Sequence, residues 1–304
     1  MKKVIVRLGN GLGNQLFTYA SAYVFAKKND AELYVDDESG FYKRHKYELH
    51  NFNISAKIIE KKYKFTNIFG RIKRKILIKF PRFNPEIKFL IEKKSKDKLT
   101  YFNPEQFNIN FDKILYIEGY FQSEKYFKNQ IDDILKEFSF KDEIKKQNIT
   151  NIDAIKNSNS VSIHFRQDKF LKDEKHKNLH KLNKEFLTDN IKLIKKGIDY
   201  FDNKLDKPKY FVWSNNFDEI KDLFTSSKFF LMKENTQKDP AYDLYLMSLC
   251  KHFILSPSTL HYWGAFLSKN NNKICLSPPD ILNKSGYYGF SNNRDIKTGW
   301  WKDI

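Results

Sequence analysis

The sequence predicts an α/β protein in which helices cover both faces of a parallel sheet. The chain begins with a short apolar strand, a glycine-rich turn, a helix and a second strand, which together form one βαβ unit. The second half alternates strands with helical runs, and parallel strands need such connections. A chain of 304 residues is also long enough for two domains with separate cores.

The amino-terminal elements follow from hydrophobic periodicity. "KKVIVRL" predicts a strand over residues 3–8, and "AELYVD" predicts a second strand over 31–36. Between them, Leu16 and Ala20 recur at the spacing of one helix face, which predicts a helix over about 14–28. These three elements form the βαβ unit with which the predicted fold begins.

The turn of this unit resembles a dinucleotide-binding loop but departs from it at one position. Gly9 and Gly11 begin the pattern G-x-G-x-x-G, and Asn14 stands where the third glycine belongs. Asn14 and Gln15 lie at the predicted helix start. A side-chain amide at that place either caps the helix or contacts a ligand, and the sequence leaves both roles open.

The second half contains five predicted strands separated by four helical runs. The strands are predicted over 160–165, 210–214, 228–232, 252–257 and 273–277, and the helices over 183–201, 216–224, 239–250 and 258–269. Because ligands of open parallel sheets bind at the carboxyl ends of strands, residues that follow the strands are the first site candidates. They are Arg166, Asn215, Ser256 and Ser258.

Two of these strand ends carry groups suited to an anion. Arg166 ends the strand of "SIHFRQDKF", where a guanidinium can contact a phosphate in bidentate fashion, and His164 shares its face. A surface arginine and a core histidine are the plain alternatives. In "SPSTLHYW", Ser258 or Thr259 can cap the following helix, and the same helix start also provides free N–H groups for an anion.

The charge of the chain indicates a negatively charged partner. The formal net charge is +18, which favours nucleic acid, an anionic membrane surface or a phosphorylated small molecule. Residues 57–98 are dense in lysine with interleaved aromatic residues. This stretch is read either as a solvated helical face or as a contact with acidic lipid headgroups.

The two cysteines and the lengths of the apolar runs indicate the cellular compartment. Cys250 and Cys275 lie inside apolar runs, which favours free thiols in a reducing compartment over a disulfide. The start "MKK" is followed by too short an apolar run for a signal peptide, and no run approaches the roughly 20 residues of a membrane span. We therefore expect a cytoplasmic protein, with peripheral contact to the cytoplasmic membrane as an option.

Metal-binding patterns are weak. "HKNLH" places two histidines at 176 and 180 without a third evident ligand. "VDDES" over 35–39 follows a strand and contains acidic residues, but a solvated turn explains it as well. We expect no metal site and no metal cofactor.

Taken together, several segments resemble glycosyltransferase family 11, the bacterial α-1,2-fucosyltransferases. "GLGNQLFTYASAYVFAK" is similar to the family's amino-terminal motif, and the later segments follow in the family's order. These are "RHKYELHNFNI", "IEGYFQSEKYF", "HFR", "VWSNN" and "LYLMSLCKHFILSPSTLHYWGAFL". The resemblance covers nearly the whole chain.

The resemblance implies a GT-B architecture, in which two Rossmann-like domains face each other across a cleft. It implies an acceptor-binding domain over 1–155 and a GDP-sugar-binding domain over 156–304. It also implies an inverting, metal-free transfer of L-fucose from GDP-β-L-fucose to a glycan acceptor, in the synthesis of a bacterial surface polysaccharide.

Site roles follow from the same resemblance. Arg166 matches the arginine that holds the leaving diphosphate, and His164 matches the histidine beside the nucleotide. Ser258 and Thr259 match a phosphate-binding pair, and Asn215 follows a strand of the donor domain. Asn14, next to Gly13, matches an asparagine near the β-phosphate and the acceptor. We therefore predict that Arg166 and Asn14 are catalytic. We predict no metal-binding residue. Seven residues are predicted to contact the GDP-sugar donor: His164, Arg166, Asn215, Ser258, Thr259, Gly13 and Asn14.

Departures from the family pattern leave alternatives open. Gln167 replaces a second arginine, "SNN" replaces an acidic stretch and "PSTLHYW" replaces a serine- and tryptophan-rich one. The donor is therefore either GDP-fucose or another GDP-sugar, such as a different deoxyhexose or a heptose, and a non-catalytic family member is a further alternative. A basic nucleic-acid-binding protein is the rival class, although no recognition motif supports it. Asp36, Asp37 and Glu118 are acidic candidates for the general base.

Overall fold

The chain forms two compact units. The computed structural model describes residues 1–41, 45–95, 99–147, 149–166, 179–218, 220–233, 239–277, 292 and 294–304. Unit 1 comprises residues 1–140 and 294–296, and unit 2 comprises residues 141–293 and 297–304. We predicted the domain boundary between residues 155 and 156, whereas the two units divide between residues 140 and 141. The short helices α4 (Asp142–Lys145) and α5 (Ile149–Lys156) pack against α7 (Pro240–Leu249) of unit 2, which explains the difference.

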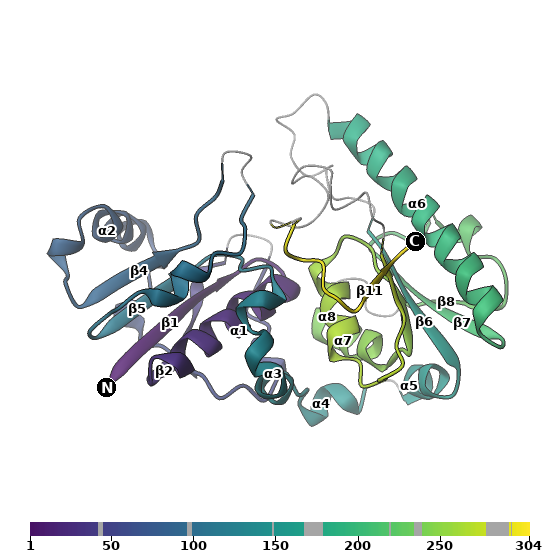
Figure 1. Cartoon of the computed structure of the whole chain (residues 1–304), viewed down its shortest axis with the longest axis horizontal. Helices are drawn as coiled ribbons and strands as arrows, with labels where there is room; N and C mark the ends of the chain where they lie inside the picture. Colours follow the sequence, from purple (N-terminus) through teal and green to yellow (C-terminus); the bar gives the residue numbers. More distant parts are fainter. Residues whose placement is uncertain are drawn as a thin grey trace. The chain divides into compact units, whose positions relative to one another are not determined.

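Unit 1 is built on a five-stranded sheet with the order β3-β2-β1-β5-β4, in which all strands are parallel (Figure 1). Its elements are β1 (Lys2–Gly9), α1 (Leu12–Lys28), β2 (Ala31–Gly40), β3 (Lys57–Ile58), α2 (Ile68–Lys79), β4 (Ile87–Ile91), β5 (Ile114–Glu118) and α3 (Ile131–Glu137). The central strand β1 is covered on both faces, since Val4, Ile5 and Val6 are fully buried.

Helix α1 and strand β4 are among the elements of unit 1 that differ from the sequence prediction. Helix α1 begins at Leu12, two residues earlier than expected, because the glycine turn is shorter than the motif indicates. Strand β4 was missed inside the lysine-rich stretch. It lies at the sheet edge, where only Ile87 and Leu90 are buried and Lys88 faces solvent, so its apolar pattern is weak.

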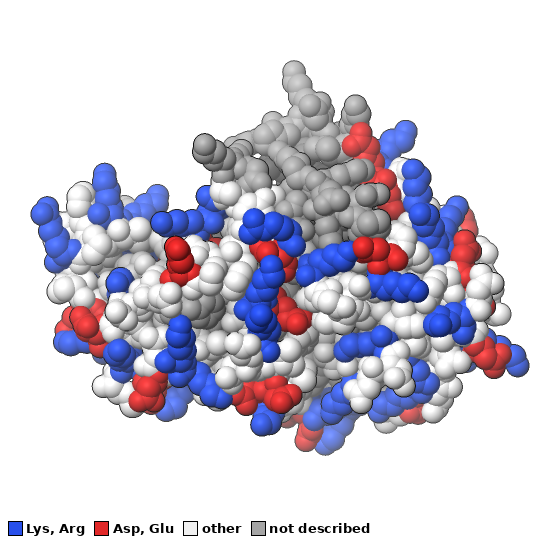
Figure 2. All heavy atoms as spheres, viewed as in Figure 1, with Lys and Arg blue, Asp and Glu red and all other residues white. Residues whose placement is uncertain are grey.

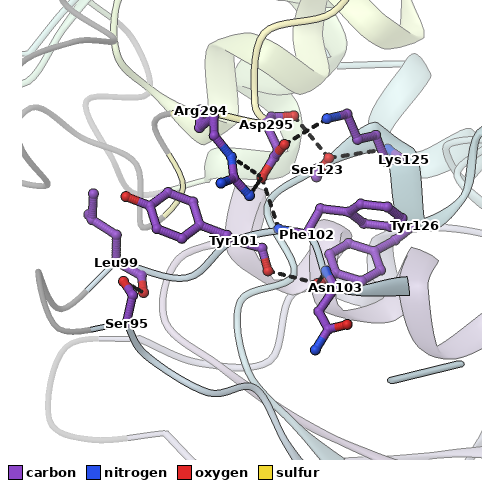
Figure 3. A network of polar contacts seen from close by, with 10 residues as sticks. All are labelled: Ser95, Leu99, Tyr101, Phe102, Asn103, Ser123, Lys125, Tyr126, Arg294 and Asp295. Atoms are coloured by element: carbon purple, nitrogen blue, oxygen red, sulfur yellow. Dashed lines mark hydrogen bonds and ion pairs between the residues drawn. The ribbon is translucent and has the colours of Figure 1, made fainter. Parts of the chain in front are cut away.

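Residues 294–296 return to unit 1 from the far end of the chain (Figure 3). The buried Asp295 carboxylate accepts hydrogen bonds from Phe102 N at 2.9 Å, from Lys125 Nζ at 2.6 Å and from Arg294 Nη2 at 3.1 Å, while its backbone oxygen accepts from Ser123 Oγ. Burial raises the pKa of this carboxyl, but these donors together lower it below its usual value. The segment is therefore an integral part of unit 1.

Unit 2 is built on a six-stranded parallel sheet with the order β11-β10-β9-β6-β7-β8. Besides α4, α5 and α7, its elements are β6 (Asn159–Phe165), α6 (Leu179–Lys204), β7 (Pro208–Ser214), β8 (Phe229–Leu231), β9 (His252–Ile254), α8 (Thr259–Leu267), β10 (Cys275–Ser277) and β11 (Trp301–Asp303). The predicted strands and the three longer helices of this half are present. Cys250 and Cys275 are buried free thiols, as expected.

One predicted helix of unit 2 is absent from the described residues. Residues 216–224 were expected to form an α-helix, but only a short 3-10 helix forms at Lys221–Leu223. Phe217, Ile220 and Phe224 have helical spacing and are buried, which produced the prediction. The Asn216 side chain accepts from Asp218 N at 3.0 Å, and this local turn competes with the helix.

Candidate functional site

The sheet of unit 2 reverses its strand order beside β6. From β6 the chain proceeds to β7 and β8 on one side, and later places β9, β10 and β11 on the other. This order is that of a dinucleotide-binding Rossmann sheet, in which ligands bind outside the carboxyl ends of the two central strands. The candidate site of unit 2 therefore lies beyond β6 and β9.

The two faces of β6 are sharply different. Val161, Ile163 and Phe165 point into an apolar core that includes the buried face of α6. Ser162 points to the opposite face and contacts α8, where its Oγ lies 3.0 Å from His261 Nε2. His164 and Arg166 have the same parity as Ser162, so the polar face of β6 leads directly to the end of the strand.

The half-buried His164 and the fully buried His261 form a pair on this face. Their rings lie 5.8 Å apart in an edge-to-face arrangement. Burial, and then the nearby Arg166 charge, lower the pKa of His164 to about 3, and burial lowers the pKa of His261 well below its usual value. Both imidazoles are therefore neutral at neutral pH.

Two polar atoms near this strand edge have no hydrogen-bond partner among the described residues. They are Nδ1 of His164 and Oγ of Ser256, and both are buried. Because Ile163 pairs with Ile254, the two residues follow neighbouring positions at the ends of β6 and β9. Of the nine such atoms found among the described residues, these two lie where a ligand of this sheet is expected, and another, Arg7 Nε, belongs to a residue of unit 1.

The other predicted donor residues of unit 2 lie at the same edge. Arg166 directly follows β6 and is exposed. Asn215 directly follows β7, whose last residue Ser214 pairs with Phe165. Ser258 caps α8, because its Oγ accepts from His261 N at 3.4 Å, and Thr259 is the first residue of that helix. The five residues predicted in this half thus end or follow three adjacent strands.

Asn14 and Gly13 lie in unit 1, in the first turn of α1. Asn14 Oδ1 accepts a hydrogen bond from Gln122 Nε2 at 2.6 Å, so the amide is held by the segment after β5. The capping alternative is wrong for both amides, since Gly11 is the N-cap and no side chain caps this helix. The oxygen of Asn14 is thus used within the protein.

Gln15 has a structural role. Its buried side chain donates to Asn10 O and Lys46 O, both at 2.9 Å, and accepts from Glu48 N at 3.0 Å. These bonds connect the glycine loop to a segment more than 30 positions along the chain. Gln15 therefore holds the loop in shape from inside the protein.

The first glycine of the loop is required by strand packing. A Cβ on Gly9 would lie 2.6 Å from Gly40 O, and one on Gly40 would lie 1.8 Å from Leu8 O. The left-handed backbone of the turn is adopted by Asn10, with φ of 63°. Close approach of β1 and β2 explains Gly9 without a bound phosphate.

A pocket of about 220 Å³ lies at the carboxyl ends of β1, β5 and β4 within unit 1. It is lined by Arg7, Leu8, Gly9, Asn10, Gly40, Ile91, Glu92, Lys94, Thr100, Glu118, Gly119 and Tyr120. Sequence reasoning missed Glu92, whose carboxylate accepts from Tyr120 N at 2.6 Å and Phe121 N at 3.0 Å. Burial raises its pKa. The only sequence signal for Glu92 is its place directly after a strand.

The acidic candidates for a general base all bind protein groups. Asp36 is fully buried and accepts from the Tyr116 hydroxyl and Ser39 N. Asp37 pairs with Lys64 at 2.6 Å. Glu118 pairs with Arg74 and Arg7. The described residues contain no cluster of three His, Cys, Asp or Glu that could bind a metal, and "HKNLH" lies outside the residues whose side chains are described.

The comparison with known families decides the identity of the chain. The sequence model of glycosyl transferase family 11 matches residues 3–301. The chain belongs to glycosyltransferase family 11. It is therefore a glycosyltransferase, and the resemblance predicted from the motifs is confirmed.

Two Escherichia coli members of family 11 are similar over most of their length. An α-1,2-colitosyltransferase is 30% identical over 296 residues, which cover 91% of this chain and 92% of that protein. The O-antigen biosynthesis glycosyltransferase WbnK is 26% identical over 289 residues, which cover 89% of this chain and 92% of that protein.

A solved structure supports the fold of this family 11 chain. A mutant of FUT1 from Arabidopsis thaliana in complex with GDP superposes with a TM-score of 0.54 at 12% identity, covering 91% of this chain and 70% of that one. Together with the two parallel sheets, this likeness confirms the predicted GT-B class with two Rossmann-like domains. In the described part of the chain, no helix has both the length and the apolar character needed to cross a bilayer.

Proposed function

We propose that this chain is an inverting, metal-independent glycosyltransferase that moves L-fucose, or a closely related deoxyhexose, from a GDP-β-linked donor to a glycan hydroxyl in α-1,2 linkage. The acceptor is proposed to be a bacterial surface polysaccharide such as an O-antigen. The observation that carries the proposal is the strand-order reversal of unit 2. Arg166, the capped start of α8 and His164 Nδ1, which has no partner within the described part of the chain, lie at one sheet edge there. The names of the two curated relatives support the linkage and the product class.

The proposed chemistry needs stabilisation of the leaving group. As the bond between the sugar and the phosphate breaks, negative charge builds on GDP. We assign Arg166 to the diphosphate, together with the N–H groups at the start of α8 and the Thr259 hydroxyl. His164 and Asn215 are assigned to neighbouring atoms of the GDP-sugar. Neutral His164 can donate or accept a hydrogen bond without adding charge.

The acceptor side is assigned to unit 1. The Asn14 amide nitrogen, oriented by Gln122 and adjacent to Gly13, is proposed to contact the reacting groups. The acceptor oxygen attacks the anomeric carbon from the face opposite the phosphate, the bond from that carbon to the phosphate oxygen breaks with its electron pair going to GDP, and the acceptor proton passes to a base or a water on the acceptor side. Asp36, Asp37 and Glu118 already bind protein donors or cations.

Nucleotide specificity gives the first test. Thermal unfolding of the full chain should be measured with GDP, UDP and CDP at equal concentrations. GDP should stabilise the native state, by about 2.7 kcal/mol at a hundredfold excess over its Kd, whereas UDP and CDP should have little effect. Stronger stabilisation by UDP would contradict the donor assignment.

The donor sugar and the metal are tested next. Transfer from GDP-fucose, GDP-colitose and a GDP-heptose to a galactoside-terminated acceptor should be compared through kcat/KM, and the linkage of each product determined. We expect a deoxyhexose donor to be preferred and activity to persist in EDTA. A strict requirement for a divalent cation would overturn the metal-independent mechanism. Absence of transfer with every GDP-sugar, despite GDP binding, would favour a non-catalytic family member.

A further inference from the structure

Helix α2 of unit 1 exposes apolar side chains to solvent. Ile68, Phe69, Ile72 and Ile76 are 67%, 78%, 50% and 43% exposed, whereas Leu77 of the same helix is buried. Six of the twelve exposed large apolar side chains among the described residues lie between positions 68 and 83. Large apolar side chains gathered in one exposed patch mark an interaction surface.

The orientation of α2 is fixed by its inner face. Successive helical residues are about 100° apart, so the four exposed apolar residues occupy one arc of about 100°. Leu77 and Arg74 lie on the opposite side of the helix. Leu77 packs in the core of unit 1, and Arg74 forms a bidentate ion pair with the buried Glu118 carboxylate. The helix is thus anchored with its apolar arc outward.

The chain continues this surface beyond the helix. Phe80 and Phe83 are 38% and 64% exposed, and a basic side chain lies over each ring: Lys79 at 5.3 Å and Arg82 at 5.7 Å from the ring centroids. We call residues 68–83 the α2 surface. Its apolar atoms therefore extend over the helix and the turn that follows.

Positive charge surrounds the apolar arc. Residues 61–85 contain nine Lys or Arg and no Asp or Glu. Lys73 and Lys75 are exposed and flank the arc on its two sides. In Figure 2, Lys and Arg side chains border uncoloured ones at the end of unit 1 where Figure 1 places α2. The net charge of +18 adds a favourable long-range field toward an anionic partner.

We propose that the α2 surface docks on an anionic lipid bilayer. The apolar arc and the two phenylalanines enter the boundary between headgroups and acyl chains, while the flanking Lys and Arg contact lipid phosphates. This arrangement, with apolar side chains at the centre and cations at the rim, is that of an interfacial helix lying in the membrane plane. The proposal does not depend on the donor sugar or on the catalytic assignments.

The distribution of charge disfavours other occupants. A nucleic-acid surface would place cations at the centre of the contact, where Ile72 and Phe69 are found here. A second copy of this chain would bring the exposed Lys73 and Lys75 of both copies to one contact, and these like charges would repel each other. An anionic bilayer offers acyl chains to the apolar arc and phosphate groups to the basic rim.

Vesicle binding tests the proposal. The purified full chain should be sedimented with large unilamellar vesicles of pure phosphatidylcholine, and with vesicles in which about one lipid in three is phosphatidylglycerol. We expect at least about tenfold tighter binding to the anionic vesicles. Since a strongly basic protein adsorbs to any anionic surface, the variants described next separate docking from adsorption.

Two paired variants address the apolar arc and its rim. Phe69→Ser with Ile72→Ser removes exposed apolar contacts, and Lys73→Glu with Lys75→Glu reverses two rim charges; all four side chains are exposed, so folding should be kept. Each pair should weaken binding to anionic vesicles at least about tenfold. The matched controls are Lys195→Glu with Lys196→Glu on the exposed face of α6, and Ile149→Ser, which should change binding less than about threefold.

Several results would overturn the proposal. They are equal binding to both vesicle types, an apolar pair that binds like the original chain, or an α6 control that loses as much affinity as the rim pair. Size-exclusion measurements should show the same oligomeric state for the chain and for both α2 variants. A dimer broken by the apolar pair would assign the surface to self-association instead. Transfer activity in solution should be unchanged in the α2 variants, which separates this test from the proposed function.

Discussion

Both units place the amino terminus of a helix near a reversal of strand order, but they equip the two positions differently. In unit 1, the side chains at the start of α1 bind other parts of the unit: Gln15 holds the loop and Asn14 is bound to Gln122. In unit 2, the corresponding edge has an exposed Arg166 and two buried polar atoms, in His164 and Ser256, that have no partner among the described residues. Gln15 and Gly9 of the loop that looks like a phosphate motif thus have structural roles, whereas the edge of unit 2 leaves polar atoms without a partner among the described residues.

The physical basis of this contrast is the cost of an unpaired buried polar group. Such a group costs on the order of 1–3 kcal/mol unless a partner is supplied. In unit 1, three hydrogen bonds to other protein groups satisfy the buried Gln15 side chain. Unit 2 leaves His164 Nδ1 without a described partner, and a bound donor can supply one. Variants in the two regions should therefore fail in different ways.

The largest effect should come from Arg166→Ala. Loss of the guanidinium should reduce kcat/KM for the GDP-sugar more than about 100-fold, or about 3 kcal/mol of barrier, because the leaving diphosphate loses its cation. The melting temperature should hardly change, since the side chain is exposed. Arg82→Ala, at an exposed arginine of unit 1, is the control and should keep its activity. If Arg166→Ala kept nearly full activity, the assignment of this residue of unit 2 to the diphosphate would be wrong.

Gln15→Ala should show the opposite behaviour. Removal of three buried hydrogen bonds should lower the free energy of unfolding by about 3 kcal/mol, as measured by denaturant titration. The GDP affinity of the remaining folded protein should be unchanged. Gln147→Ala, at an exposed glutamine, should alter neither property. A large loss of GDP affinity with unchanged stability would assign the loop to the nucleotide.

The buried histidines predict a pH dependence of stability. The pKa of His164 is lowered to about 3 and that of His252 to about 4, mainly by burial in both cases. Between these values and the usual value near 6.5, the unfolded chain binds more protons than the folded one. Stability should therefore fall as the pH is lowered, by about 2 kcal/mol for each histidine at pH 5.

Substitution of the same two histidines sharpens the comparison. His164→Asn and His252→Asn should both reduce the slope of unfolding free energy against pH between 7 and 5. Only His164→Asn should also weaken GDP binding, because His252 lies at the opposite end of β9 and accepts from Ile274 N. Equal loss of GDP affinity in both variants would indicate a general structural effect.

The smallest effect is expected for Ser258→Ala. Loss of the N-cap of α8 should cost about 1 kcal/mol of stability. It should also weaken GDP binding several-fold, since the hydroxyl no longer orients the helix start. Asn67→Ala removes the N-cap of α2, which accepts from Gly70 N at 2.7 Å, and serves as the control. That variant should lose similar stability with unchanged GDP affinity.

Much of the fold and part of the site could be predicted from the sequence. The strand pattern predicted β6, β7 and β9 because their apolar residues are continuous or alternate clearly, and the motifs predicted the family. Strand β4 was missed because an edge strand needs few buried residues, and residues 216–224 were read as a helix from spacing alone. Glu92 and the partner of Asn14 were missed because they depend on contacts between distant segments.

The sequence by itself determined the α/β class, the family and the chemical types placed after each strand, because these depend on local periodicity and short motifs. The tertiary structure alone decided which of those groups are already bound within the protein. It placed Gln15 among backbone partners, returned Asp295 to unit 1 and turned the apolar arc of α2 outward. The physical reason is that hydrogen bonding and burial depend on distances in space, which residues far apart in the chain supply to one another.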